Sequence, residues 1–173
     1  MNDLVFRIAK EADEQAILDF YESVRKSGRE SGTCDWADDY PSKEILADDI
    51  KNRRLWLSEI FSESSEKKIA GTFSILETDD LDDEPLPWTA IKSCVPARIA
   101  VAPEMQGKGF GKLLLREIIA IAKKGGFQSL RLLASKKNDR ANRLYQSALF
   151  VLKGEARLYG GEYIAYEYLI KAN

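Results

Sequence analysis

The sequence predicts a single α+β domain over residues 1–173, with a mixed central β-sheet flanked by helices in the order βααβββαβαββ. Three observations predict this class. The length suits one domain with one core. Short β-rich or alternating segments are interleaved with longer segments of helical periodicity. The strands and helices do not alternate strictly, which disfavours a purely parallel sheet.

The N-terminal half is predicted to hold a strand, two helices and a hairpin. Apolar residues recur at helical spacing after residue 11, and this pattern predicts a helix that ends at Gly28. Ser42 precedes the second helical segment and is expected to cap it. The elements are a strand at 4–9, helices at 11–28 and 42–52, and a hairpin of strands at 55–61 and 68–76.

The C-terminal half is predicted to begin with an acidic loop. The segment ETDDLDDEPLPW at 77–88 is interrupted by proline, which favours a solvated excursion over a regular element. A strand bent or started by Pro96, a glycine turn and an amphipathic helix that ends at Gly125-Gly126 come next. The elements are strands at 93–101 and 127–134, helices at 110–124 and 138–149, and a closing hairpin of 151–158 and 161–170.

The composition excludes several classes of protein. With 45% hydrophobic and 31% charged residues, the chain is an ordinary globular protein without a run of about 18 apolar residues that could span a membrane. Cys34 and Cys94 are far apart, so we expect free thiols in a reducing compartment, the cytoplasm. The absence of histidine excludes histidine-based triads and most zinc catalysis, and no metal site is expected.

The charges are unevenly distributed. Residues 1–97 carry a net charge of −10, whereas residues 98–143 carry +8. Two regions of opposite sign suggest an anionic ligand at the basic region and a cation near the acidic one. An equal alternative is that the acidic residues only solvate surface helices. The basic region lacks interleaved aromatic residues, so no nucleic-acid partner is expected.

The basic region contains the glycine-rich stretch QGKGFGK at 106–112. A P-loop requires glycine where Gln106 stands, and the dinucleotide-binding fingerprint requires glycine where Lys112 stands. What remains is a strand, a short turn and QxxGxG at the start of a helix. Glycines let the backbone approach a ligand closely, and a helix N-terminus favours an anion. The stretch therefore predicts a phosphate-binding turn.

This stretch resembles the central motif of the GNAT family of N-acetyltransferases, [QR]xxGx[GA]. Its three fixed positions are matched by Gln106, Gly109 and Gly111. The element order agrees over nearly the whole chain. A second family segment, N..A..LY followed by a phenylalanine, is matched by Asn138, Ala141, Leu144, Tyr145 and Phe150.

The resemblance implies acetyl-CoA as the cofactor. It implies that a β-strand pairs its backbone with the pantetheine arm, that Asn138 hydrogen-bonds that arm, and that the glycine turn holds the pyrophosphate. The strand residues are Ile99, Ala100 and Val101, and the turn residues are Gln106, Gly107, Lys108, Gly109, Phe110, Gly111 and Lys112.

The resemblance also implies that Tyr145 contacts the cofactor and is the general acid that protonates the leaving thiolate; the alternative is a core tyrosine. Ala97 and Leu133 stand where relatives often carry polar or acidic side chains. Candidates for the base are therefore Glu77, which is also a candidate acceptor contact, or a water relay.

Trp36 and Tyr40 lie in the loop between the first two helices, which in this fold covers the acceptor. Aromatic rings among Asp35, Asp38 and Asp39 would suit a cationic amine. The alternative is that Trp36 anchors the loop to the core.

These observations together predict an enzyme that transfers acetyl from acetyl-CoA to a small-molecule primary amine in a ternary complex. Two alternatives stay open: a catalytically weak acyl-CoA-binding sensor, and a protein N-acetyltransferase acting on lysine or an N-terminus. A homodimer that pairs through the Gly160-Gly161 hairpin is left open as well.

Overall fold

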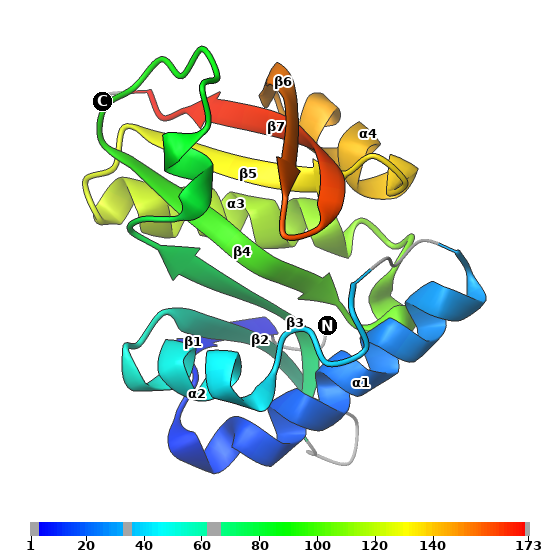
Figure 1. The fold of residues 1–173 in the computed structure, drawn as a ribbon. Coiled ribbons are helices and arrows are strands. Elements are labelled where there is room, and N and C mark those ends of the chain that lie inside the picture. Colours follow the sequence, from blue (N-terminus) through cyan, green and yellow to red (C-terminus); the bar gives the residue numbers. More distant parts are fainter. Residues whose placement is uncertain (1–3, 33–35, 62–66, 172–173) are drawn as a thin grey trace. The chain divides into compact units, whose positions relative to one another are not determined.

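A computed structural model describes residues 4–32, 36–61 and 67–171 (Figure 1). The predicted α+β class and the order of strands and helices are confirmed, with three short 3₁₀ turns added at 11–13, 80–83 and 103–105. Seven strands lie in the order β1 (Leu4–Ile8), β2 (Leu55–Phe61), β3 (Lys67–Leu76), β4 (Ser93–Val101), β5 (Ser129–Ser135), β7 (Gly161–Leu169) and β6 (Val151–Leu158). The β4–β5 pair is parallel and the β5–β7 pair antiparallel, so the sheet is mixed as predicted.

The chain forms two compact units, each built from two stretches of sequence. The first unit comprises residues 1–74 and 98–114, and the second comprises 75–97 and 115–173. The boundaries fall inside β3 (Lys67–Leu76), β4 (Ser93–Val101) and α3 (Phe110–Lys124). The two units are described separately below.

In the first unit, β1 (Leu4–Ile8), β2 (Leu55–Phe61) and β3 pair antiparallel in sequence order. The helices α1 (Glu14–Glu30) and α2 (Lys43–Lys51) lie against these strands, drawn blue and cyan in Figure 1. Their apolar faces bury one cluster with alternate residues of β2, because alternate strand residues share a face. The cluster includes Ile17, Phe20, Tyr21, Val24, Leu46, Ile50, Leu55, Leu57 and Ala100.

In the second unit, the N-terminal part of β4 pairs with β5 (Ser129–Ser135). The antiparallel hairpin of β6 (Val151–Leu158) and β7 (Gly161–Leu169) continues the order beyond β5. The red arrow of β7 therefore lies beside the yellow arrow of β5 in Figure 1. The helix α4 (Asp139–Ser147) contacts β5.

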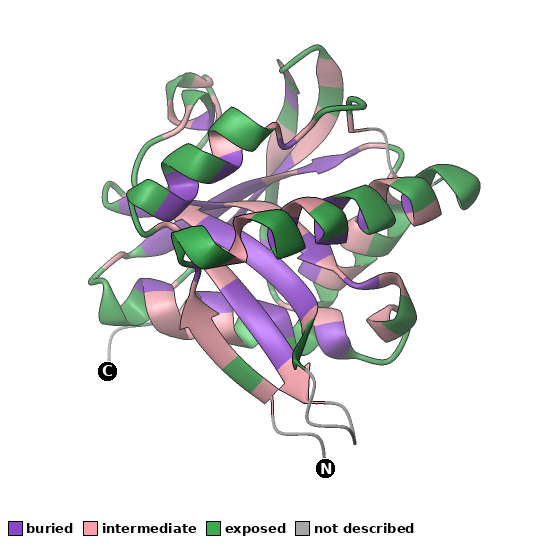
Figure 2. Ribbon diagram, turned by 90° about the horizontal axis from the view of Figure 1, so that it is seen from below, coloured by how far each residue is buried: buried purple, intermediate pink, exposed green. Residues whose placement is uncertain are grey.

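The helices are amphipathic. Figure 2 shows buried purple on one side of each and exposed green on the other. This division is what the 3.6-residue spacing of apolar side chains predicts. Among the described residues, no helix is both long enough and apolar enough to cross a membrane.

Several predicted boundaries differ from the structure by one to three residues, and the helix expected from residue 11 begins at Glu14, after the 3₁₀ turn. The helix α1 continues beyond Gly28 to Glu30, because that glycine is buried inside the helix and does not end it. The strand β5 begins at Ser129, two residues late. The helix α4 ends at Ser147 rather than 149, and Asn138 stands before it as its N-cap.

Candidate functional site

The glycine turn follows β4 in the first unit and begins with Pro103–Met105 in a 3₁₀ turn. Gly107 and Gly109 have φ values of +76° and +82°, which side chains of L-residues rarely adopt. A Cβ atom added at either glycine would meet no described atom within 4 Å. The turn therefore needs glycine for its backbone conformation, and the space beside it is open to a ligand.

Hydrogen bonds hold both ends of this turn. The Gln106 side chain donates to the Val101 carbonyl at 3.1 Å and so ties the turn to β4. The Lys112 amide donates to the Gly109 carbonyl. For the amides of residues 107–109, no main-chain acceptor is found within the described part of the chain. Lys108 and Lys112 are exposed and add positive charge beside these amides.

Phe110 anchors the start of α3. Its side chain is 4% exposed and lies beside Gly71 of β3. A Cβ atom at Gly71 would come within 2.9 Å of the Ala100 carbonyl oxygen and 3.2 Å of the Phe110 ring. Glycine at this position lets β3 approach the backbone of β4 closely.

The strand β4 is irregular at Arg98. This residue has a φ of +53°, a strained conformation for a side chain of this size. Its carbonyl accepts a hydrogen bond of 2.8 Å from the Tyr21 hydroxyl, which in turn accepts one from Thr72. Pro96, which was expected to bend the strand, lies within it in a buried position. The sequence carries no signal that would have placed the irregularity at Arg98.

A buried ion pair joins β4 to α2. Arg98 Nη1 lies 3.2 Å from Asp49 Oδ2, and the Asp49 side chain is 2% exposed. Ser74 of β3 donates to the same carboxylate oxygen. The sequence prediction missed Asp49, although its position on the apolar side of α2, beside Leu46 and Ile50, is a signal that could have singled it out.

Trp36 and Tyr40 lie together in the α1–α2 loop. Their ring centroids are 5.5 Å apart, and the Trp36 ring is also 6.1 Å from Tyr21. Trp36 packs against the core cluster of the first unit, as the anchoring interpretation predicts. Asp38 forms an ion pair with Arg29 at 2.6 Å, so its charge already has a partner.

Tyr145 lies in α4 of the second unit and is 6% exposed. Its ring contacts those of Phe150 and Tyr166, with centroids 5.6 and 5.8 Å away. Burial and the neighbouring Tyr166 raise the pKa of the Tyr145 hydroxyl well above its ordinary value, so it keeps its proton at neutral pH. No hydrogen bond of this hydroxyl is found among the described residues.

Asn138 and Asn142 fix the start of α4. Asn138 Oδ1 accepts a hydrogen bond of 3.0 Å from the Ala141 amide, and this bond caps the helix. The bond occupies one of the two lone pairs of the Asn138 side-chain oxygen. The Asn142 amide group donates to the Ser135 carbonyl, and its oxygen accepts the Tyr166 hydroxyl at 3.0 Å. The sequence analysis missed Asn142, which together with Tyr166 holds α4 against the strands of this unit.

Glu77 follows β3 directly, as predicted, and is exposed. Ala97 and Leu133 pack against a small apolar cluster of Leu76, Leu81 and Val95. In this unit, the two positions where relatives often carry polar groups therefore have apolar surroundings.

Cys94 is fully buried. Burial, with a smaller effect of Asp82, raises the pKa of its thiol to about 12, so the thiol is protonated at neutral pH. Cys34 and Asp35 lie outside the described residues.

The acidic segment at 77–88 is a loop, as predicted, with Glu77, Asp80 and Asp83 exposed, but this loop and the two residues after it also make contacts that the sequence did not predict. Glu167 of β7 is fully buried and accepts the amides of Thr89 and Ala90. Arg131 of β5 donates to Asp82 at 2.7 Å. The Arg131 guanidinium also lies 4.8 Å from the centre of the Trp88 ring. These contacts attach the segment to the strands of the second unit, and residues 80–83 form a 3₁₀ turn within it.

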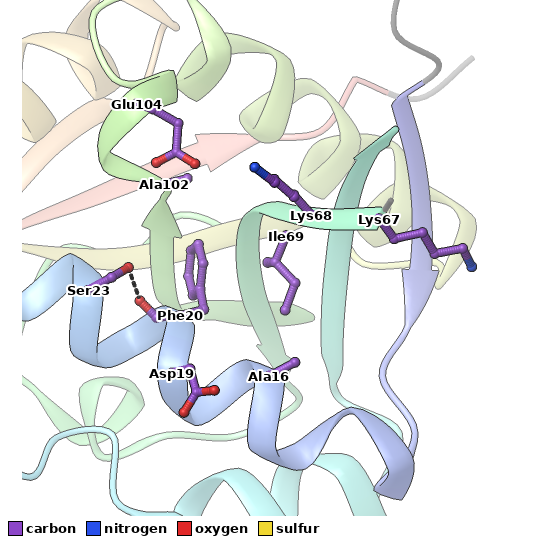
Figure 3. A pocket seen from close by; sticks show the side chains of 9 residues that line it. All are labelled: Ala16, Asp19, Phe20, Ser23, Lys67, Lys68, Ile69, Ala102 and Glu104. Carbon is purple, nitrogen blue, oxygen red and sulfur yellow. Dashed lines mark hydrogen bonds between the residues drawn. The ribbon is translucent and has the colours of Figure 1, made fainter. Parts of the chain in front are cut away.

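The first unit also contains an open pocket of about 360 Å³ between α1, the start of β3 and the turn after β4. Figure 3 shows Phe20 and Ile69 in its lining, with Lys68 reaching toward the side of Glu104 and Lys67 pointing away. None of the predicted site residues is among the described residues that line it. Within the described ranges, no group of three or more acidic or cysteine side chains could hold a metal ion.

The structure gathers the predicted residues into two sets. The first unit holds the residues predicted for the phosphate turn, the pantetheine strand and the acceptor aromatics. The second unit holds Glu77, Asn138 and Tyr145.

A family model described as the acetyltransferase (GNAT) family matches residues 17–149. This match covers most of the chain, which therefore belongs to the GNAT family of acetyltransferases. No match was found among curated proteins.

Solved acetyltransferase structures have the same fold as this chain. A GNAT-family acetyltransferase from Streptococcus agalactiae has a TM-score of 0.81 at 20% identity, over 98% of this chain and 96% of that one. The yncA protein of Salmonella typhimurium, solved with its cofactor acetyl-CoA, has a TM-score of 0.69 at 18% identity, over 99% and 96%. The ribosomal-protein-S18-alanine N-acetyltransferase of Escherichia coli has a TM-score of 0.67 at 18% identity, over 99% and 96%.

Proposed function

We propose that the protein transfers an acetyl group from acetyl-CoA to a primary amine by direct attack in a ternary complex. The observation that carries the proposal is the glycine turn at 106–112 in a member of this family. Its two glycines with positive φ, the open space beside them and the adjacent lysines fit a bound pyrophosphate. The yncA protein of the same fold was solved with acetyl-CoA.

The cofactor contacts proposed for this chain are those of the glycine turn, one β-strand segment and Asn138. Residues 106–112 hold the pyrophosphate, and Asn138 and the backbone of Ile99–Val101 hold the pantetheine arm. The Val101 carbonyl already accepts Gln106. We therefore assign Gln106 the role of fixing the turn, and we assign contact with the phosphates to the amides that follow it.

Direct transfer requires two proton movements. The neutral amine nitrogen attacks the thioester carbonyl carbon, and the carbon–sulfur bond breaks. The departing thiolate takes a proton from the Tyr145 hydroxyl, which is protonated at neutral pH as any tyrosine hydroxyl is. The attacking nitrogen loses its proton to Glu77, which is exposed to solvent, or to water.

One observation favours a second function. Ala97 and Leu133 have apolar surroundings where a base is often placed, as expected of a catalytically weak acyl-CoA-binding sensor.

For both functions we place the protein in the cytoplasm, where acetyl-CoA is present and thiols stay reduced.

Calorimetric titration with acetyl-CoA tests the proposal. We expect Gly109→Glu to weaken binding at least 100-fold, because the new carboxylate enters the phosphate space. Gly160→Glu is the matched control. Gly160 also has a positive φ, +75°, and open space at its Cβ position, but it lies in the β6–β7 turn. Equal affinity for acetyl-CoA in both variants would refute the assignment of the turn.

Turnover distinguishes the enzyme from the sensor. Release of free CoA thiol is followed with polyamines, amino acids, aminoglycosides and peptides that carry a free lysine or N-terminus. Turnover of small amines supports the proposal, and turnover of peptides alone indicates a protein acetyltransferase. Tight acetyl-CoA binding without turnover of any acceptor identifies a sensor.

A further inference from the structure

Arg98 is held by residues of the first unit at both its backbone and its side chain. The Tyr21 hydroxyl of α1 donates to the Arg98 carbonyl at 2.8 Å, and the Asp49 carboxylate of α2 lies 3.2 Å from Arg98 Nη1. Ser74 of β3 donates to the same carboxylate oxygen. One residue inside β4 is therefore connected to the two helices that precede it in the chain and to β3.

The backbone of Arg98 has an unusual conformation for its place in the fold. Its φ of +53° falls inside a strand. The other described non-glycine residues with a positive φ lie in connections between elements: they are Arg53, Leu149 and Tyr159. A strained conformation of this kind persists only where surrounding groups impose it. The contacts from Tyr21 and Asp49 are restraints that can do so.

Stability alone does not explain the ion pair of Asp49 and Arg98. The Asp49 side chain is 2% exposed, and Arg98 Nε and Nη1 are buried without a hydrogen-bond partner among the described residues. Taking two charges out of water costs free energy that their attraction often fails to recover, so apolar residues of similar size are commonly at least as stabilising. A buried pair can instead select one conformation of the chain.

The conformation of Arg98 sets the orientation of the peptide group that follows it. The Arg98 carbonyl and the Ile99 amide belong to one planar trans peptide group, in which C=O and N–H point in opposite directions. The bond to the carbonyl therefore directs the Ile99 N–H away from the Tyr21 hydroxyl. Ile99 is the first residue of the segment Ile99–Val101, which is proposed to pair with the pantetheine arm.

We propose that Asp49 is a positioning residue of the cofactor site. Its carboxylate holds the Arg98 guanidinium and so keeps the backbone before Ile99 in the conformation that binds the pantetheine arm. Because the Asp49 side chain is almost closed to solvent, it acts through Arg98 and not by contact with the ligand. The inference rests on the proposed binding of acetyl-CoA and adds a residue of α2, a helix without any predicted site residue.

A pair of ligands tests this role. Acetyl-CoA is compared by calorimetry with its nucleotide half, 3′-phospho-ADP, which keeps the pyrophosphate for the glycine turn but lacks the pantetheine arm. A residue that positions the strand should affect only acetyl-CoA, since a preorganised segment loses less freedom on binding. We expect Asp49→Asn to weaken acetyl-CoA binding about 10-fold and to leave nucleotide binding nearly unchanged.

A second variant keeps the test independent of folding. Removing Asp49 alone leaves the charge of Arg98 buried without a partner, which is strongly destabilising. The combination of Asp49→Leu, Ser74→Ala and Arg98→Met removes all three polar partners. We expect this triple variant to be as stable as the unaltered protein and to show the same selective loss. Asp48→Asn is the matched control, because Asp48 is exposed, pairs with Arg54 and should change neither affinity.

Three results would overturn the inference while the proposed cofactor site stays intact. One is an unchanged acetyl-CoA affinity in the triple variant. Another is equal weakening of both ligands, which indicates general distortion of the first unit. The third is failure of the triple variant to fold, because a need for stability would then account for the ion pair. Failure of the unaltered protein to bind acetyl-CoA, or to bind 3′-phospho-ADP, would instead refute the proposed cofactor site.

Discussion

Lys153 Nζ lies 2.8 Å from the buried carboxylate of Glu167. The same ammonium donates to the Pro87 carbonyl and the Thr89 hydroxyl. Both β6 and β7 of the closing hairpin are thus connected to the segment that precedes β4. A fully buried carboxylate is tolerated here because an ammonium and two amides surround it.

Stability should depend on pH through Glu167. Burial alone would raise the pKa of this carboxyl, but hydrogen bonds from Lys153, Thr89 and Ala90 outweigh it and lower the pKa to about 2. A lowered pKa in the folded state stabilises the fold above the unfolded-state pKa, and this contribution is lost as pH falls from about 5 to about 2. Its size is on the order of 3 kcal/mol.

We therefore expect Glu167→Gln to lose about this amount at pH 7 and to show a flatter fall in stability on acidification. Urea unfolding at a series of pH values measures both effects. Glu162→Gln in the same strand is the control, since Glu162 is exposed and its ion pair with Arg157 should contribute little. Equal losses in the two variants would contradict the prediction.

Tyr145→Phe should separate catalysis from stability. The hydroxyl makes no hydrogen bond among the described residues, so its removal should leave the melting temperature nearly unchanged. We expect kcat to fall on the order of 100-fold, with little change in the KM for acetyl-CoA. Tyr166→Phe should behave in the opposite way, because it loses the bond to Asn142 and should lower stability more than kcat. A fully active Tyr145→Phe protein would exclude the acid role.

Gly71→Ala should destabilise the first unit. The added methyl would lie 2.9 Å from the Ala100 carbonyl oxygen, which belongs to a strand backbone and cannot move freely. We expect a loss of about 1–3 kcal/mol from overpacking, measured by thermal unfolding. Acetyl-CoA affinity should also fall, because the displaced segment of β4 is the one proposed to pair with the pantetheine arm. If the variant is as stable as the unaltered protein, β3 and β4 can move apart there without loss of folding free energy, which would contradict the prediction.

Tyr21→Phe should release the carbonyl of Arg98. The variant keeps the ring packing but removes the donor to that carbonyl and the acceptor for Thr72, at a cost of about 1–3 kcal/mol. We also expect a lower kcat for acetyl transfer, because the Arg98 carbonyl loses the hydrogen bond that fixes its backbone. Thr72→Val removes only the second bond and should cost less stability and leave kcat closer to that of the unaltered protein.

The sequence predicted the elements well because their signals are local. The helix at 110–124 has its predicted ends. The glycine turn before it and Gly125-Gly126 after it limit the helix through their own backbone conformations, which do not depend on distant residues. The spacing of Gln106, Gly109 and Gly111 was sufficient to indicate the family.

The contacts of the acidic segment were not predictable in the same way. Asp82 and Arg131 are 49 positions apart, and no local pattern pairs them. The irregular backbone of Arg98 depends on Tyr21, which is 77 positions away. The base and the acceptor depend on such distant contacts, which explains why the sequence left them open.

The division of β3 between the two units has a consequence for synthesis on the ribosome. Residues 75–97 leave the ribosome before the strands β5, β6 and β7 to which their unit belongs. Unpaired strand segments are prone to aggregate during such a delay. The run ETDDLDDE, near the start of this stretch, makes the nascent chain strongly negative, and its Asp82 can pair with Arg131 only after that residue has been translated. We therefore expect the acidic run to repel neighbouring chains during synthesis, and its Asp82 then to neutralise Arg131 in the folded unit.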